Sequence, residues 1–173
     1  MKTLPGDYIA GFVDGEGCFA LTFRRDVRHK RKGSPEYFYW DIDFIIVLRE
    51  DDLEILEKIQ QTLQCGTISK TKSGNVRYNV SRMEDLVKII VPFFHQYPLH
   101  AKKKFDFLLW AEAVNIFWRN QYPQGNTKIR KRGFQKVNWD AEDLSRLQGI
   151  KEEMQIYKAK GSGSKWLKKP KEE

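Results

Sequence analysis

The chain has 173 residues, 40% of them hydrophobic and 13% aromatic, and its 31 Lys and Arg against 23 Asp and Glu give a formal net charge of +8. These values fit one folded domain and exclude a disordered chain, and no apolar run approaches the roughly 20 residues of a membrane helix. The chain starts without the apolar core of a signal peptide, and its two cysteines lack metal-site spacing, so we expect a protein that is not secreted and stays inside the cell, in cytoplasm, nucleoid or organelle matrix.

The first part of the chain is predicted to form a helix followed by two strands. A short apolar segment predicts a helix over 7–16. Alternating apolar residues then predict strands over 18–25 and 37–48, separated by a basic loop over 26–35 that ends in Gly, Ser and Pro.

The next part repeats this helix–strand–strand order and continues with helices. Leu and Ile recur at helical spacing after residue 50, and the turn SGN separates two short strands. We place helix 51–64, strands 67–72 and 76–81, and helices 82–91, 100–118 and 139–157. Pro92 is expected to stop the helix before it. The sequence therefore predicts a domain over 1–158 and a basic, disordered tail over 159–173.

This order predicts an α+β fold of αββαββα type, with a four-stranded antiparallel, saddle-shaped sheet and helices on one face. The other face is expected to be open and polar. Its predicted residues are Thr22, Arg24, Tyr39, Asp41, Ser69, Thr71, Arg77 and Asn79. Such a surface suits a nucleic-acid duplex, in whose major groove Arg pairs with guanine and Asn with adenine, although an ordinary solvated sheet face would show the same pattern.

The positive charge is clustered rather than spread along the chain. RRDVRHKRK at 24–32 holds six Lys and Arg, and KIRKRGFQK at 128–136 holds five. Basic runs are often solvated surface, but several of them with aromatics nearby favour a nucleic-acid partner. The basic residues that we expect to contact DNA, besides those of the open face, are Arg25, Arg28, Lys30, Lys70, Lys72, Lys128, Arg130 and Lys131.

The stretch YIAGFVDGEG at 8–17 places glycines inside a predicted helix, where each costs roughly 1 kcal/mol relative to alanine. Gly11 and Gly15 share one face, flanked by Tyr8 and Phe12, so the same helix of a second copy could approach closely across a two-fold axis. Two copies of Glu16 would then meet near that axis and could hold Mg²⁺. The alternative is that DGEG is a surface turn with solvated acids.

Residues 9–17, IAGFVDGEG, resemble the signature of the LAGLIDADG homing endonucleases position by position. The αββαββα order and the basic helix start HAKKKFDF at 100–107 are similar as well. The resemblance covers about residues 7–118. Members with a single motif are homodimers joined through their motif helices, which agrees with the glycine spacing.

The resemblance also implies roles for individual residues. Glu16 would coordinate the catalytic metal, Mg²⁺ or another divalent ion such as Mn²⁺ or Ca²⁺, and the Gly15 carbonyl could contribute. Asp14 matches the structural acid of the family. A catalytic lysine is expected at the start of the helix after the second hairpin, where Lys102 matches best and Lys103 is the rival.

The implied activity is a double-strand break in a long, nearly palindromic DNA target, as in intron or intein homing. The alternatives are an intron maturase that binds RNA and a DNA-binding regulator of the same fold that does not cleave. The chain departs from the family pattern at the end of the second strand. It has Leu48 where many relatives carry glutamine, and Asp52 where some carry arginine, with Arg49 nearby.

Overall fold

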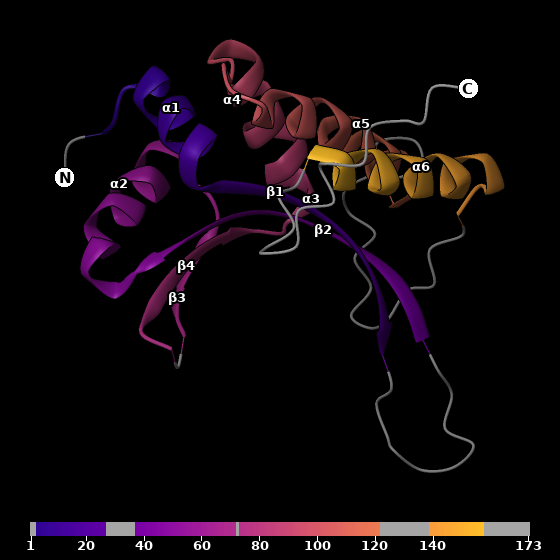
Figure 1. Ribbon diagram of the computed structural model, residues 1–173, viewed down its shortest axis with the longest axis horizontal. Helices are drawn as coiled ribbons and strands as arrows, with labels where there is room; N and C mark the ends of the chain where they lie inside the picture. The colour runs from indigo at the N-terminus through magenta and orange to yellow at the C-terminus, as the bar shows by residue number, and fades with distance from the viewer. Residues whose placement is uncertain (1–2, 27–36, 72, 122–138, 158–173) are drawn as a thin grey trace, which may run out of the picture.

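The computed structural model describes residues 3–26, 37–71, 73–121 and 139–157. Four antiparallel strands form one sheet in the order β1-β2-β4-β3, which curves into an arch with the helices on its convex side (Figure 1). The strands are β1 (Gly17–Asp26), β2 (Tyr37–Arg49), β3 (Thr67–Lys70) and β4 (Asn75–Val80). The predicted fold class and the predicted order of elements are confirmed.

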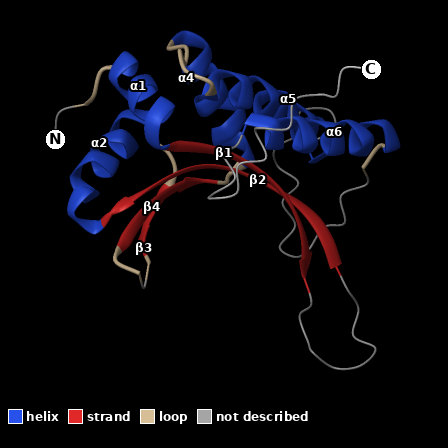
Figure 2. Cartoon of the chain, in the orientation of Figure 1, coloured by secondary structure: helices blue, strands red, loops and turns tan. Residues whose placement is uncertain are grey.

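The helices lie in one layer over one face of the sheet, as Figure 2 shows by colour. They are α1 (Gly6–Glu16), α2 (Leu53–Leu63), the short α3 (Met83–Asp85), α4 (Val91–Gln96), α5 (Lys103–Gln121) and α6 (Ala141–Tyr157). Alternate residues of β4 are buried against this layer, Val76, Tyr78 and Val80 among them. Period-two burial of this kind leaves the other side chains of each strand on the opposite, concave face.

Helix α5 connects the layer to the sheet and supports the last helix. The Trp110 indole is fully buried and donates a hydrogen bond to the Ala20 carbonyl of β1 (3.2 Å). Helix α6 packs on α5 through Leu147, Ile150 and Met154, which are all buried. Their spacing of three and four residues places them on one face of the helix.

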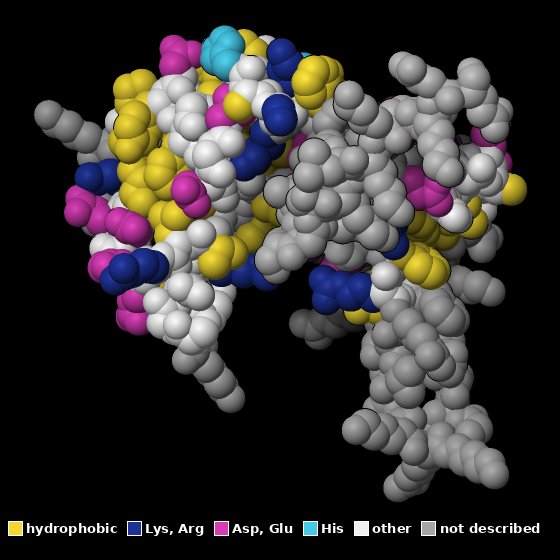
Figure 3. All heavy atoms as spheres, viewed as in Figure 1, with side chains coloured by type: hydrophobic (Ala, Val, Ile, Leu, Met, Phe, Trp, Pro, Cys, Tyr) yellow, Lys and Arg dark blue, Asp and Glu magenta, His cyan; other side chains and the backbone are white. Residues whose placement is uncertain are grey.

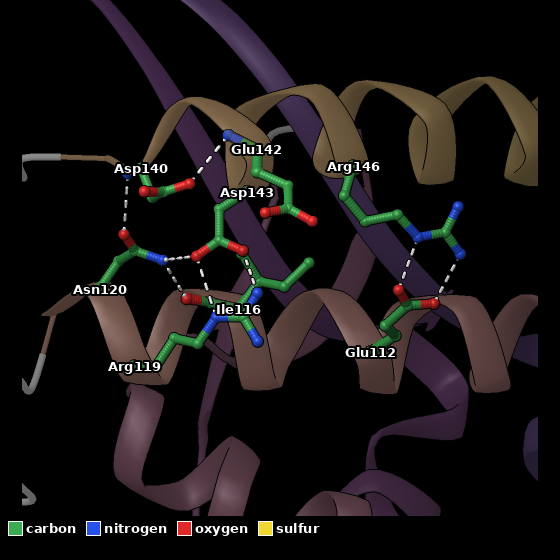
Figure 4. Close-up of polar contacts among 8 residues, drawn as sticks. All are labelled: Glu112, Ile116, Arg119, Asn120, Asp140, Glu142, Asp143 and Arg146. Atoms are coloured by element: carbon green, nitrogen blue, oxygen red, sulfur yellow. Dashed lines mark hydrogen bonds and ion pairs between the residues drawn. The ribbon is translucent and has the colours of Figure 1, made fainter.

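Charged pairs fix α6 on α5 at two points along the helices (Figure 4). The Arg119 guanidinium donates two hydrogen bonds to the Asp143 carboxylate, one of them from Nε at 2.9 Å. One turn further along α6, Arg146 holds Glu112 through two bonds of 2.6 Å each. Bidentate Arg–carboxylate pairs fix orientation as well as distance, so α6 is held at a set position along α5.

The prediction that Pro92 ends the helix before it is wrong. Helical backbone continues from α3 through a π-helical turn (Leu86–Ile90) into α4, with Pro92 near the start of α4. The backbone N–H of Val91 bonds to the carbonyl of Leu86 in the wider π pattern. A proline at the first turn of a new helical segment loses no hydrogen bond that the segment needs, so the π turn lets the chain pass the proline.

No helix among the described residues is long and apolar enough to cross a membrane. The predicted disordered tail and most of the loop before α6 lie outside the described ranges.

Candidate active site and nucleic-acid interface

Helix α1 has two faces of different character. Ile9, Ala10 and Val13 are buried against the core. Gly17 follows the helix, and a Cβ there would lie 2.5 Å from the Val13 side chain, so this glycine is required by close packing within the chain. The opposite face of α1 points outward, and it carries the four residues predicted for the dimer interface: Tyr8, Gly11, Phe12 and Gly15.

Close packing does not require the two outward glycines of α1, Gly11 and Gly15. A Cβ built on Gly11 or on Gly15 meets nothing within 4 Å. Beside them, Tyr8 is 50% exposed and stacks on Phe12 with ring centroids 6.4 Å apart. Hydrophobic side chains gather on the surface over α1 and α2 (Figure 3). A helix that loses roughly 1 kcal/mol at each of two exposed glycines gains nothing from them inside this chain.

Asp14 anchors the segment that leads into α5. Its Oδ2 atom accepts hydrogen bonds from the backbone N–H groups of His100 (2.7 Å) and Ala101 (3.1 Å). These residues are far from Asp14 in the chain, so one carboxylate ties the end of α1 to the start of the fifth helix. This contact agrees with the structural role that the resemblance implied for Asp14. Helix α5 begins two residues after this contact, at Lys103.

The anchor places Lys103, and not Lys102, at the end of α1. Lys103 is half-buried, and its Nζ donates to the Gly15 carbonyl at 3.1 Å. Lys102 is exposed, and its ammonium makes no recorded bond with another described residue. Lys102 lies in the turn before α5, whereas Lys103 is the first residue of that helix. Of the two, only Lys103 has its ammonium bonded to the motif among the described residues. Lys103, the second of the two predicted candidates, is therefore the lysine that lies at the end of α1.

Burial lowers the pKa of the Lys103 ammonium, although Cys18, Asp14 and Glu16 nearby act in the opposite direction. The lysine reaches a helix C-terminus, whose free carbonyls carry partial negative charge and attract cations. A lysine with a lowered pKa exchanges its proton more readily near neutrality than an ordinary one does. At this end of α1, burial therefore opposes the charge of Lys103, and the nearby acids and the free carbonyls favour it.

Glu16 is the last residue of α1, directly before β1, and it is exposed. No hydrogen bond or ion pair to its carboxylate is recorded within the described ranges, so both oxygens can accept a ligand. Among the described residues no three His, Cys, Asp or Glu side chains come together as a metal site. Glu16 and the Gly15 carbonyl fit a hard divalent ion as partial ligands, and a complete coordination shell needs further oxygens besides these two.

The concave face of the sheet is organised in transverse rows by the strand register. Because paired residues in antiparallel strands point to the same side, Cys18, Ile45, Asn79 and Thr67 form one row across all four strands. This row starts two residues after Glu16. The seven residues predicted on this face within β1, β2, β3 and β4 do lie there: Thr22, Arg24, Tyr39, Asp41, Ser69, Arg77 and Asn79.

Some of the residues predicted to contact DNA lie away from the concave face or outside the described part of the chain. Lys70 pairs with Val76 and so points to the opposite side of the sheet, where its ammonium bonds to Glu50. Thr71 follows β3, and its hydroxyl contacts Ser73 in the turn. The side chain of Arg25 lies outside the described part, as do all the other predicted phosphate-contacting residues: Arg28, Lys30, Lys72, Lys128, Arg130 and Lys131.

The face also contains Asp43, which was absent from the predicted set. The residue is 6% exposed, and its carboxylate accepts a hydrogen bond from the Asn79 amide (3.2 Å). Burial raises the pKa of Asp43, and the charge of Asp41 adds to the rise. The alternation in β2 placed Asp43 on this side, but nothing in the sequence distinguished it from a solvated acid.

Leu48, the departure from the family pattern, does not belong to the concave face. It pairs with Val76 and packs against the core, so it lies on the helix side of the sheet. At this end of β2, the residues on the concave side are Val47 and Arg49. Arg49 forms an ion pair with Asp51 (2.9 Å). The substitution at Leu48 therefore removes no polar group from the concave face.

Comparison with known proteins agrees with this geometry. Residues 9–114 match the model of the LAGLIDADG endonuclease family. A probable intron-encoded endonuclease of Schizosaccharomyces pombe, Cox1-I1b, is 34% identical over 110 residues, which are 63% of this chain and 27% of that protein. A probable intron-encoded DNA endonuclease of Mycosarcoma maydis is 33% identical over 101 residues, 58% of this chain and 34% of that protein.

Two solved structures share the fold. I-SmaMI bound to uncleaved DNA in the presence of calcium ions has a TM-score of 0.69 at 24% identity, covering 90% of this chain and 46% of that one. The LAGLIDADG meganuclease I-AabMI bound to uncleaved DNA has a TM-score of 0.67 at 24% identity, covering 88% and 45%. The chain thus spans about a quarter to a third of these relatives and just under half of these structures. The family match covers more than half of its residues, and the chain belongs to the LAGLIDADG endonuclease family.

Proposed function

We propose that this chain is a site-specific DNA endonuclease that makes a double-strand break in a long, nearly palindromic target of the kind associated with intron homing. We further propose that it acts as a homodimer with Mg²⁺, or another divalent ion such as Mn²⁺ or Ca²⁺. One observation carries this proposal. The Glu16 carboxylate, which has no bonded partner among the described residues, and the Lys103 ammonium, which donates to the Gly15 carbonyl, both lie at the end of α1, at the edge of an open polar sheet face.

Each group has a distinct part in phosphodiester hydrolysis. Glu16 and the Gly15 carbonyl would hold the divalent ion, which when bound supplies a water of lowered pKa and stabilises the leaving oxygen. Lys103 would stabilise negative charge on the scissile phosphate. Its Nζ donates to the Gly15 carbonyl, and this bond keeps the ammonium near Glu16 at the end of α1. The rows of the concave face would contact base edges in the major groove.

A single chain offers one Glu16, whereas cutting both strands needs two such sites. The outward glycines of α1 support a second copy that packs there and brings its own Glu16 near the same axis. The solved structures of this fold have chains about twice as long as the matched region, which supports two units in the working assembly. We propose that the second unit is an identical chain.

The direct test is a selection for cleaved sites from a randomised duplex library with Mg²⁺. We expect enrichment of one long sequence whose two halves are related by inversion. Enrichment by binding without any cleavage, in any of the three metals, would indicate the non-cleaving DNA-binding alternative. Binding of structured RNA in preference to duplex DNA would indicate the maturase alternative.

The choice between the two lysines gives a matched pair of variants. Lys103→Met keeps the aliphatic stem but removes the ammonium, and we expect cleavage to fall by about 10²–10³-fold, the usual cost of one electrostatic donor at a reacting oxygen. Lys102→Met should change the rate by less than about fivefold, as expected for an exposed charge. Single-turnover cleavage of the selected duplex measures both. A larger loss in Lys102→Met would overturn the assignment of Lys103.

The glycine face gives a prediction in which two effects have opposite sign. Gly11→Ala should stabilise the isolated helix by up to about 1 kcal/mol, yet it should weaken dimerisation by about tenfold or more because the methyl group separates the helices. Sedimentation equilibrium across a dilution series measures the dimer constant. Gly149→Ala on α6 is the control, since its Cβ also meets only ordinary contacts, at 3.8 Å or beyond. Equal dimer constants for both variants would exclude α1 as the interface.

A further inference from the structure

A chain of hydrogen bonds crosses the concave face near the motif. Arg77 donates from Nη2 to the Asn79 Oδ1 atom at 3.3 Å, and Asn79 donates from Nδ2 to the Asp43 Oδ1 atom at 3.2 Å. Arg77 and Asn79 lie on β4 and Asp43 on the neighbouring β2. The row of Asn79 begins at Cys18, two residues after Glu16, so these residues lie in the part of the face closest to the metal-binding end of α1.

The chemistry of the two outer members fixes the middle one. A guanidinium can only donate hydrogen bonds, and an ionised carboxylate can only accept them. Asn79 must therefore turn its oxygen to Arg77 and its nitrogen to Asp43. A primary amide has two N–H groups and two oxygen lone pairs, so one donor and one acceptor stay uncommitted, with their order along the face determined.

The burial of Asp43 suits it to holding the Asn79 amide in this orientation. Because the residue is only 6% exposed, Asp43 is poorly placed to contact a base edge itself. Asp41, on the same strand and the same face, is more exposed and pairs with Arg24 instead. Asp41 and Asp43 are two residues apart on β2. Of these two acids, only Asp43 accepts a hydrogen bond from an amide side chain of a described residue.

We propose that Asp43 is a positioning residue for DNA specificity: it fixes the amide of Asn79 so that one donor and one acceptor face an adenine at an inner position of each half-site. This inference rests on the proposed function, because it needs a duplex in the concave face. An adenine presents N7 as acceptor and N6 as donor in the major groove, which matches the free pair on Asn79.

The test is a binding selection from a randomised duplex library in EDTA, which reports base preference at every position without cleavage. We expect wild type to prefer an A·T pair at one inner position of each half-site. Asp43→Asn should reduce this preference by about tenfold, because an amide at 43 can present either its oxygen or its nitrogen and so no longer fixes Asn79. Preferences at the other positions should stay within about twofold of wild type.

Glu57→Gln is the matched control, because it also removes one negative charge but lies on α2, over the other face of the sheet. It should leave the inner A·T preference intact. Asn79→Ala should remove that preference, and adding Asp43→Asn to it should produce no further change, since Asp43 acts through Asn79. Asp43→Ser provides a second, smaller variant whose hydroxyl both donates and accepts, and the same loss is expected if Asp43→Asn fails to fold.

Two results would overturn the inference while the proposed function stands. One is an unchanged base profile in a folded Asp43 variant, and the other is an equal loss of affinity for all sequences. If wild type enriches no duplex sequence at all, the proposed function fails, and this inference fails with it.

Discussion

Glu16→Gln should reduce cleavage of the selected duplex by at least about 10³-fold and leave DNA binding within about threefold. Metal assistance is worth several kcal/mol to phosphodiester hydrolysis, and each 1.36 kcal/mol is a factor of about ten in rate. The amide keeps the shape of the side chain but loses the charge that holds a divalent ion. Because Glu16 is exposed and makes no recorded bond within the described residues, its replacement should not disturb the fold.

Asp7→Asn is the control for this change, since Asp7 is also an exposed acid on α1. It lies at the opposite end of the helix, and we expect its cleavage rate to match wild type. Single-turnover rates with saturating Mg²⁺ and binding constants in EDTA separate chemistry from binding. Cleavage by Glu16→Gln at the wild-type rate would refute the metal role of Glu16.

DNA affinity should fall by about 10³–10⁵ between 50 and 200 mM salt, as expected if about six to ten phosphates are neutralised. The net charge of +8 and the basic runs at 24–32 and 128–136 motivate this value. Each cation that contacts a phosphate releases a condensed counterion, and the slope of log K against log salt is about −0.9 per phosphate neutralised. Fluorescence anisotropy over a salt titration measures the slope.

The triple variant Arg28→Gln, Lys30→Gln, Arg31→Gln should lower the magnitude of that slope by about 0.9 for each phosphate that the variant no longer neutralises. Its control is Lys58→Gln with Lys88→Gln, because these lysines belong to helical segments over the convex side of the sheet. The control should keep the wild-type slope. A slope near zero for wild type would argue against a duplex held along the concave face.

The sequence predicted the fold well because its signals were local. Alternation in the strands identified the concave face, and the register then placed seven of the predicted residues there. The predicted stop at Pro92 failed because the chain inserts a π turn before the proline, and single-residue signals do not reveal such an adjustment. The outward glycines of α1 were predicted from spacing alone, and the open space at Gly11 supports that interpretation.

The site residues were harder to predict because they depend on contacts between distant segments. The choice between Lys102 and Lys103 depends on how the segment before α5 lies against α1, and Asp14 bonds to that segment from 86 residues away. Asp43 likewise acquires its role only when β4 brings Asn79 beside it, 36 residues further along the chain. Periodicity assigns a residue to a face, but it does not identify which partner the fold will supply.

The proposed function depends most on two copies of this chain meeting through α1 over one target. Native mass spectrometry of the Glu16→Gln variant on the selected duplex measures this directly, because binding then proceeds without cleavage. We predict two chains per duplex for Glu16→Gln, and a shift toward one chain at equal concentration when Gly11→Ala is added. A single chain per duplex at saturating protein, without the glycine change, would contradict the proposed homodimer.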